Sequence, residues 1–209
     1  MIDIEAIVVV SLKHRHDRRA ALEPLLKRAM DEGVLPRLDI EYVNRYPQHR
    51  TLIPKWWENK PSYYAASREH EAVLLDLTHR RVNQALILED DAQLLETFFS
   101  EADAFYHEVI ENCPNWQGIF FGGRNRNGKD HVSARVWRDK GCLGSHAYLV
   151  NRTGIQSLFD ELSKDELVVD WAYELVMEAI PEFYSPKDYY VGTFGSWSDT
   201  LDAFAPSNS

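Results

Sequence analysis

The chain has 209 residues, of which 44% are apolar and 27% charged, and its formal net charge is −10. This composition excludes wholesale disorder and is typical of a globular protein, and the length suits one domain over residues 1–209, with a polar tail from about residue 200. The negative charge argues against binding along nucleic acid or on an anionic membrane surface, because both attract basic faces. A phosphorylated ligand would need clustered arginines, helix N-termini or a bound cation.

Alternating element types predict the fold class. Short apolar or β-branched runs predict strands at residues 6–12, 39–44, 85–89, 118–123, 141–150 and 188–194. Amphipathic spacing predicts helices at residues 17–33, 67–84, 94–112, 152–162 and 171–180. Ser67 is a candidate helix N-cap, Gly33 a candidate helix stop, and residues 45–66 are expected to be irregular. We expect an α/β domain whose mostly parallel sheet is flanked by helices.

Three features of the sequence bear on the cellular compartment. Cys113 and Cys142 lie far apart and are interpreted as free thiols of a reducing compartment. In the first residues, acids precede the apolar run and basic residues follow it, which is unlike a signal peptide. No apolar stretch has the length of a membrane span. These features predict a cytoplasmic protein without a membrane span.

The strand at residues 85–89 runs directly into three acids, Glu89, Asp90 and Asp91. In open α/β sheets ligands bind beyond the carboxyl ends of the strands. Extended geometry would point Glu89 and Asp91 to one side and Asp90 to the other, and two converging carboxylates suit a divalent cation. The alternative is that Asp90 or Asp91 caps the following helix. One cap needs only one acid, however, and three adjacent carboxylates repel each other.

Four segments in order resemble glycosyltransferase family 25, the lipopolysaccharide and collagen galactosyltransferase group. They are VVVSLKHRHDRR, ASREHEAVLLDLTHRRVNQALILEDDAQL, GSHAYLVNRTGIQSLFDEL and VVDWAYEL, and the resemblance covers roughly residues 6–180. Two departures concern Ser11, where the family usually has Asn, and the helix motif Ser67-Arg68-Glu69-His70, which replaces an adjacent Ser-His pair. The resemblance bears more firmly on the fold than on the acceptor.

The resemblance implies the A-type glycosyltransferase fold and a UDP-sugar donor, UDP-glucose or UDP-galactose. It also implies a glycan or other hydroxyl acceptor, and inversion at the anomeric carbon. Mn²⁺ or Mg²⁺ would be held against the diphosphate by Asp91 directly and by Glu89 directly or through water, while Asp90 touches ribose or sugar. Such a cation stabilises the charge that develops on the departing diphosphate.

Basic residues follow the first strand, where a helix N-terminus is a natural phosphate site. As a group in an acidic protein they favour nucleotide contact over a solvated turn, with the backbone of Ser11 and Leu12 facing the base. The basic residues of this turn are Lys13, Arg15, Arg18 and Arg19.

Two histidines and one aspartate complete the candidate site. His146 is a candidate further metal ligand, as the A-type fold often uses a late His, although a lone His in an apolar strand is more often a core residue. His70 would line the donor site by resemblance, or simply pack within its helix. Asp170 would be the base that takes the acceptor proton, and it is also a candidate N-cap for residues 171–180.

Aromatic residues offer stacking surfaces or packing. Trp56, Trp57, Tyr63 and Tyr64 suit either a sugar or nucleobase contact or core packing. Near the C-terminus, GTFGSWSDT resembles a family segment and places Trp197 and Asp199 as candidate acceptor contacts.

A phosphatase and a non-catalytic binding protein are the alternative functions. A phosphatase of the haloacid dehalogenase type needs a nucleophilic Asp in a D-x-D-x-T pattern on an early strand, and this pattern is absent around Glu89. A non-catalytic nucleotide-sugar or carbohydrate binding protein of the same fold stays open.

Overall fold

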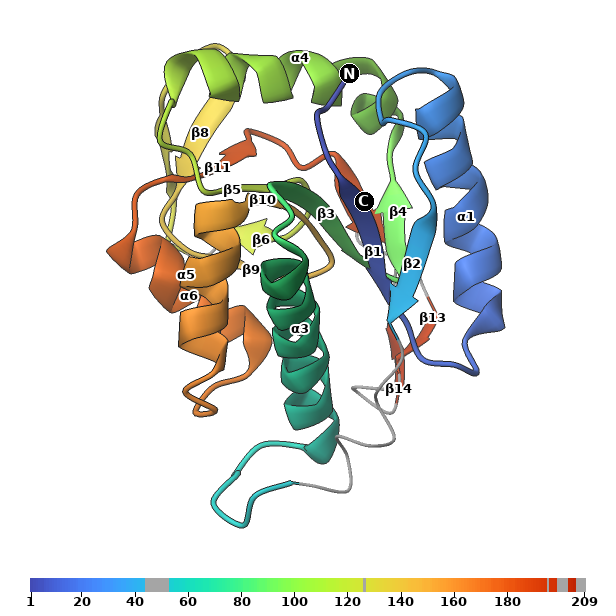
Figure 1. Ribbon diagram of the computed structural model, residues 1–209, viewed down its shortest axis with the longest axis vertical. Helices are drawn as coiled ribbons and strands as arrows, with labels where there is room; N and C mark the ends of the chain where they lie inside the picture. Colours follow the sequence, from blue (N-terminus) through green and yellow to red (C-terminus); the bar gives the residue numbers. More distant parts are fainter. Residues whose placement is uncertain (44–52, 126, 195, 199–202, 206–209) are drawn as a thin grey trace.

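An eight-stranded sheet forms the centre of the computed structural model, which describes residues 1–43, 53–125, 127–194, 196–198 and 203–205 (Figure 1). The strand order is β2-β1-β3-β10-β5-β11-β8-β7. The strands are β1 (Ala6–Val10), β2 (Ile40–Val43), β3 (Gln84–Glu89), β5 (Gly118–Phe120), β7 (Lys129–His131), β8 (Val136–Asp139), β10 (Ala147–Asn151) and β11 (Phe183–Pro186).

The sheet is mixed, but most of its strands share one direction. β1 pairs in parallel with β2 and β3, and β5 pairs in parallel with β11. β10 is inserted antiparallel between β3 and β5, and β8 is antiparallel to both β11 and β7. Only β10 and β8 therefore run against the other strands. The prediction of a mostly parallel sheet is confirmed.

Helices cover both faces of the sheet (Figure 1). On one face, α1 (His16–Asp31) and α4 (Glu96–Asn112) pack through apolar side chains such as Leu26 and Phe98. On the other, α3 (Pro61–Arg80), α5 (Arg152–Leu162) and α6 (Val169–Ala179) pack side by side. Burial on both faces explains why the central strands are continuous apolar runs.

The alternation of side chains along β3 determines which layer of helices each of them faces. Along β3, Leu86 and Leu88 face α1 and α4, whereas Ala85 and Ile87 face α3, α5 and α6. Continuing that alternation puts Glu89 on the α3 side of the sheet. Glu89, the last residue of β3, therefore points toward α3, whereas Asp90 and Asp91 follow in the turn beyond the strand.

Three short strand pairs form separate two-stranded sheets beside the central sheet. β4 (Ala92–Leu94) pairs with β12 (Val191–Thr193), and β6 (Arg124–Asn125) pairs with β9 (Cys142–Leu143). β13 (Ser196–Ser198) pairs with β14 (Ala203–Ala205), and β14 lies inside the region expected to be a polar tail. The sequence predicted none of β4, β6, β7, β8 and β11.

The start of α3 corrects two predictions. The helix begins at Pro61 rather than Ser67, because proline suits the first helical turn, where its missing N–H needs no partner. Ser67 is not an N-cap: it lies inside the helix, and its hydroxyl donates to the backbone oxygen of Tyr63 at 3.0 Å. The last residues of the predicted irregular segment are therefore helical, while residues 44–52 lie outside the described residues.

Several smaller predictions hold. α1 ends at Asp31 and is followed by Gly33 with φ +76°, a left-handed conformation that favours glycine after a helix. Cys113 and Cys142 are both buried free thiols. No helix among the described residues has the length and apolar character needed to cross a bilayer.

Candidate active site

The candidate site lies at the carboxyl ends of β1 and β3, as the sequence predicted from the acids after residue 88. Asp90 and Asp91 form a turn between β3 and β4, and α4 begins only at Glu96, with Leu95 at its N-cap position. The alternative that these acids cap the following helix is therefore wrong.

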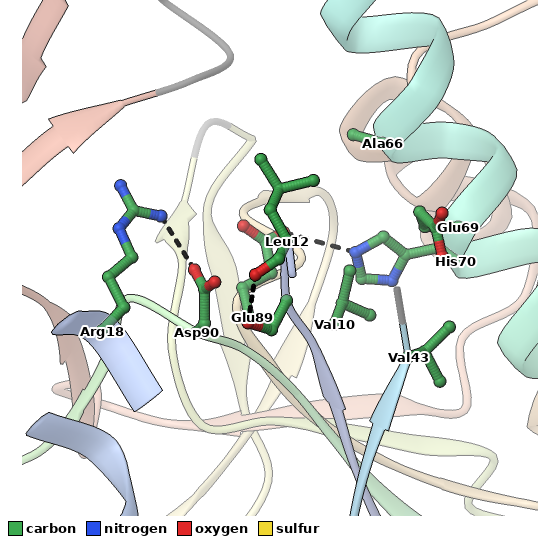
Figure 2. A pocket seen from close by; sticks show the side chains of 10 residues that line it. Val10, Leu12, Arg18, Val43, Ala66, Glu69, His70, Glu89 and Asp90 are labelled. Atoms are coloured by element: carbon green, nitrogen blue, oxygen red, sulfur yellow. Dashed lines mark hydrogen bonds and ion pairs between the residues drawn. The ribbon is translucent and has the colours of Figure 1, made fainter. Parts of the chain in front are cut away.

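Two adjoining cavities share Arg18, Ala66 and Glu89 in their walls. The first is a recess of about 70 Å³ bounded by the end of β1, the turn after it and His70 of α3 (Figure 2). The second, of about 390 Å³, is bounded by charged residues of several elements: Arg18, Glu89, Asp91, Arg124 and Asp170. Asp90 borders the first cavity, Asp91 the second and Glu89 both, but Asp90 and Asp91 lie in a turn and both contact Arg18, so the predicted alternation does not continue beyond Glu89.

Arg18 bridges the two aspartates. It is the third residue of α1, and its Nη1 lies 2.9 Å from Oδ1 of Asp90 (Figure 2). The same nitrogen lies 3.4 Å from Oδ2 of Asp91. Burial raises the pKa of Asp90, although the ion pair with Arg18 opposes the rise. One guanidinium therefore offsets part of the charge of two carboxylates.

Arg19, by contrast, holds the turn after β1. Its Nε donates to the hydroxyl of Ser11 at 2.7 Å, and its Nη2 donates to the backbone oxygen of Leu12. These bonds fix the backbone that borders the first cavity.

Glu89 faces the opposite way and is held by two side chains. The hydroxyl of Ser145 donates to Oε1 of Glu89 at 2.5 Å, and Nε2 of His70 lies 3.4 Å from the same oxygen. Burial acts to raise the pKa of Glu89, but the contacts with His70 and Ser145 outweigh it and lower the pKa to about 2. These contacts favour the ionised form of Glu89.

A buried hydrogen-bonded chain supports His70. Its Nδ1 lies 2.8 Å from the hydroxyl of Tyr148, which lies 2.8 Å from the hydroxyl of Tyr173. If Tyr173 donates to Tyr148 and Tyr148 donates to Nδ1, both tyrosine protons have acceptors, and Nε2 carries the remaining proton on the side of Glu89, without a hydrogen-bond partner among the described residues. The reverse order would point an unprotonated nitrogen toward a carboxylate. We therefore assign the Nε2–H tautomer.

Asp91 is the least compensated of the acids. Its Oδ1 is buried and has no hydrogen-bond partner in the part of the chain that the structure describes. Burial and the charge of Glu89 raise the pKa of Asp91 to about 7, against the opposing charge of Arg18. A buried carboxylate in this state gains stability from an added cation.

Asp170 lies across the second cavity as the second residue of α6. Its Oδ1 accepts a hydrogen bond from the backbone N–H of Ser145 at 3.0 Å. Because Val168 occupies the N-cap position, the expectation that Asp170 caps the helix is wrong. Burial and the charge of Glu89 raise its pKa above the ordinary aspartate value, which suits a group that accepts a proton.

A divalent cation fits this set of donor atoms only if a bound substrate and water supply further oxygen ligands. No three His, Cys, Asp or Glu side chains among the described residues converge in an arrangement that would hold a metal ion alone. Mg²⁺ and similar ions are commonly held by one or two carboxylates together with substrate phosphates and water. The unpartnered Oδ1 of Asp91 beside Glu89 fits that mode and not an all-protein cage.

Four residues predicted to bind nucleotide or metal border neither cavity: Lys13, Arg15, Arg19 and His146. Lys13 is exposed, and Arg15 is buried in a bidentate ion pair with Asp17. His146 packs against Gly122, where an added Cβ would fall 2.3 Å from its Nε2, and burial lowers its pKa. Their proposed roles in binding nucleotide and metal stay predictions.

The aromatic candidates separate into two groups. Trp57 and Tyr64 are buried and pack edge to face with centroids 5.0 Å apart, whereas Tyr63 borders the second cavity. Asp199 lies outside the described residues, and of Trp197 the structure describes the backbone alone.

Sequence reasoning missed several residues of the second cavity, among them Arg124, Ser145 and Trp171. Arg124 comes shortly after the carboxyl end of β5, so the rule that located Glu89 would also have located it. Ser145 gave no signal, because it acts partly through its backbone N–H.

Comparisons with known proteins bear on the fold. No family model matches the sequence, and no curated protein matches it significantly, so membership of family 25 stays a prediction. A glycosyltransferase involved in the glycosylation of the major capsid of PBCV-1 superposes with a TM-score of 0.50 at 11% identity, covering 87% of this chain and 82% of that one.

Two further structures superpose less well. A197 from STIV has a TM-score of 0.48 at 14% identity and covers 98% of this chain and 95% of that one. UDP-glucose pyrophosphorylase complexed with UDP-glucose has a TM-score of 0.46 at 9% identity and covers 87% and 91%. The likeness to the capsid glycosyltransferase, together with the sheet order, shows that this chain has an A-type glycosyltransferase-like fold.

Proposed function

We propose that this chain is a metal-dependent glycosyltransferase that moves a hexose from a UDP-sugar to a hydroxyl acceptor with inversion. The observation that carries the proposal is the grouping of Glu89, Asp91 and Asp170 around one cavity at the carboxyl end of β3. Each of these carboxylates has a different electrostatic state, which matches three different tasks in such a transfer.

The donor would lie across both cavities. Arg18 stands near the N-terminus of α1, and Arg124 borders the second cavity on β6, so two guanidiniums can contact a diphosphate. The first recess is smaller than a nucleoside, so only part of the ribose or base would enter it, beside Ser11 and Asp90. Mn²⁺ or Mg²⁺ bound between Asp91, Glu89 and the diphosphate would supply Lewis-acid stabilisation of the leaving group.

Asp170 would act as the base. The acceptor oxygen forms a bond to the anomeric carbon and its proton goes to Asp170, while the bond to the diphosphate breaks and its electron pair leaves with the diphosphate. The N–H of Ser145 holds the carboxylate in place. Because the same residue's hydroxyl holds Glu89, Ser145 sets the position of the base relative to the proposed metal site.

Donor turnover separates this proposal from its main alternative. Purified protein would be incubated with a panel of UDP-sugars that includes UDP-glucose and UDP-galactose, with Mn²⁺, and UDP release measured. We expect release from at least one donor, with strong loss in the Asp91→Asn variant. Binding of UDP-sugars without release above the buffer rate would favour the non-catalytic binding protein.

A further inference from the structure

A large aromatic side chain lies exposed beside the proposed base. Trp171 directly follows Asp170 in the first turn of α6, and 44% of its surface is accessible. It borders the second cavity together with Tyr63 of α3. Two elements that line the cavity therefore each contribute an aromatic residue.

Packing of α6 does not account for a tryptophan at this position. The helix buries Ala172, Tyr173 and Val176 against the core, while Trp171 and Leu175 point to solvent, Leu175 with 45% exposure. The tryptophans at positions 57 and 116 are in contrast almost fully buried. An exposed large apolar side chain that borders a polar cavity indicates a ligand contact.

We propose that Trp171, with Tyr63, forms the acceptor subsite and that it stacks on the apolar face of a pyranose whose hydroxyl meets Asp170. The inference rests on the proposed function and names its acceptor class. The ring C–H groups of a pyranose carry partial positive charge and suit the electron-rich face of an indole.

The other residues of the wall favour the same class of acceptor. Asn59 and Arg124 also border this cavity and offer hydrogen-bond donors of the kind that sugar hydroxyls use. Three carboxylates in one cavity, in a chain of net charge −10, disfavour an anionic acceptor such as a phosphorylated or uronic sugar. A neutral pyranose satisfies both the aromatic and the polar parts of this surface.

Saturation-transfer NMR tests the subsite directly. The probes are methyl β-D-glucopyranoside and methyl β-D-galactopyranoside, with glycerol and N-acetylserinamide as non-pyranose hydroxyl compounds, all with UDP and Mn²⁺ present. We expect transfer to the ring C–H protons of a pyranoside with wild type, and affinity about tenfold or more lower in Trp171→Ala. Trp171→Phe should restore part of it.

Leu175→Ala provides the matched control, because Leu175 is equally exposed one turn along the same helix but does not border the cavity. It should bind the pyranoside like wild type, and circular dichroism would verify that each variant is folded. Absence of transfer to either pyranoside, equal transfer to glycerol, or unchanged binding in Trp171→Ala would overturn the inference. UDP release by wild type without any acceptor is measured separately, so failure of the proposed function is distinguishable from failure of the subsite.

Discussion

Replacing Asp91 with asparagine should make the protein more stable while removing its proposed cation site. The pKa of Asp91 is raised to about 7, mainly by burial and next by the charge of Glu89. A folded-state pKa above the unfolded value means that the native state holds the proton more tightly than the unfolded state. Stability from this group is therefore fully present at low pH and lost as pH rises from about 4 through 7. Asparagine carries no charge and should not show this loss.

The magnitude follows from the same shift. The difference between about 7 and the ordinary 3.8 corresponds to on the order of 4 kcal/mol at alkaline pH. The Asp91 side chain is 20% exposed and shares its charge balance with Glu89, so about half of this, roughly 2 kcal/mol, is the expected gain. For a chain of this length that gain raises Tm by about 4–8 °C.

Thermal unfolding in chelator from pH 4 to 8.5 would measure the effect. The Tm difference between Asp91→Asn and wild type should be near zero at pH 4, grow through neutrality and level off above about pH 8. Asp31→Asn is the control, because Asp31 is exposed and its pKa is lowered by Lys27, so this change should stabilise at no pH. A Tm difference that does not depend on pH, or a less stable Asp91→Asn at pH 8, would refute this account of the site.

Four further predictions concern UDP binding, the proposed base Asp170, the thiol of Cys142 and the hydrogen-bonded chain of Tyr148. UDP at a hundredfold excess over its Kd should stabilise wild type by about 2.7 kcal/mol in Mn²⁺, measured by thermal shift, and an equal shift in chelator would contradict the metal role. Asp170→Asn should retain UDP binding, measured by calorimetry, and lose transfer to acceptor; retained turnover would remove Asp170 as the base. Burial raises the pKa of the Cys142 thiol to about 12, so a disulfide reagent should modify it at pH 8 far more slowly than in urea, and equal rates would contradict its burial. Tyr148→Phe should cost roughly 1–3 kcal/mol in urea unfolding, because His70 and Tyr173 both lose a partner, and a cost below about 0.5 kcal/mol would count against the chain.

Elements that are buried on both faces could be predicted from sequence, and short edge strands could not. β1, β3 and β10 are continuous apolar runs because helices cover both sides of them. β8 mixes Val136 and Trp137 with charged residues, and β4 has three residues, so neither shows a clear period. The start of α3 was not predicted because prolines and aromatic residues hide the helical period there. Pro61 lies in the first helical turn, where proline is tolerated.

The candidate site was predictable where a residue's role depends on its position along a strand. Glu89 and its neighbours could be found because they end a buried run. Among the basic residues of the first turn, sequence alone did not single out Arg18, whose role depends on where the first turn of α1 meets the turn after β3. Arg15 is instead paired with Asp17, two residues away, and this local pairing was a signal available in the sequence.

The three carboxylates of the second cavity differ in pKa because the fold surrounds each with different hydrogen-bond donors and charges. Glu89 is surrounded by donors, Ser145 and His70, and stays charged. Asp170 receives one backbone N–H and is otherwise desolvated, which raises its pKa above the ordinary aspartate value. Asp91 has a carboxylate oxygen with no hydrogen-bond partner among the described residues, so of the three carboxylates it would gain most from a cation bound from solution. Strand alternation, a turn in place of a helix start, and the two hydrogen bonds of Ser145 together place three carboxylates in different electrostatic states around one cavity.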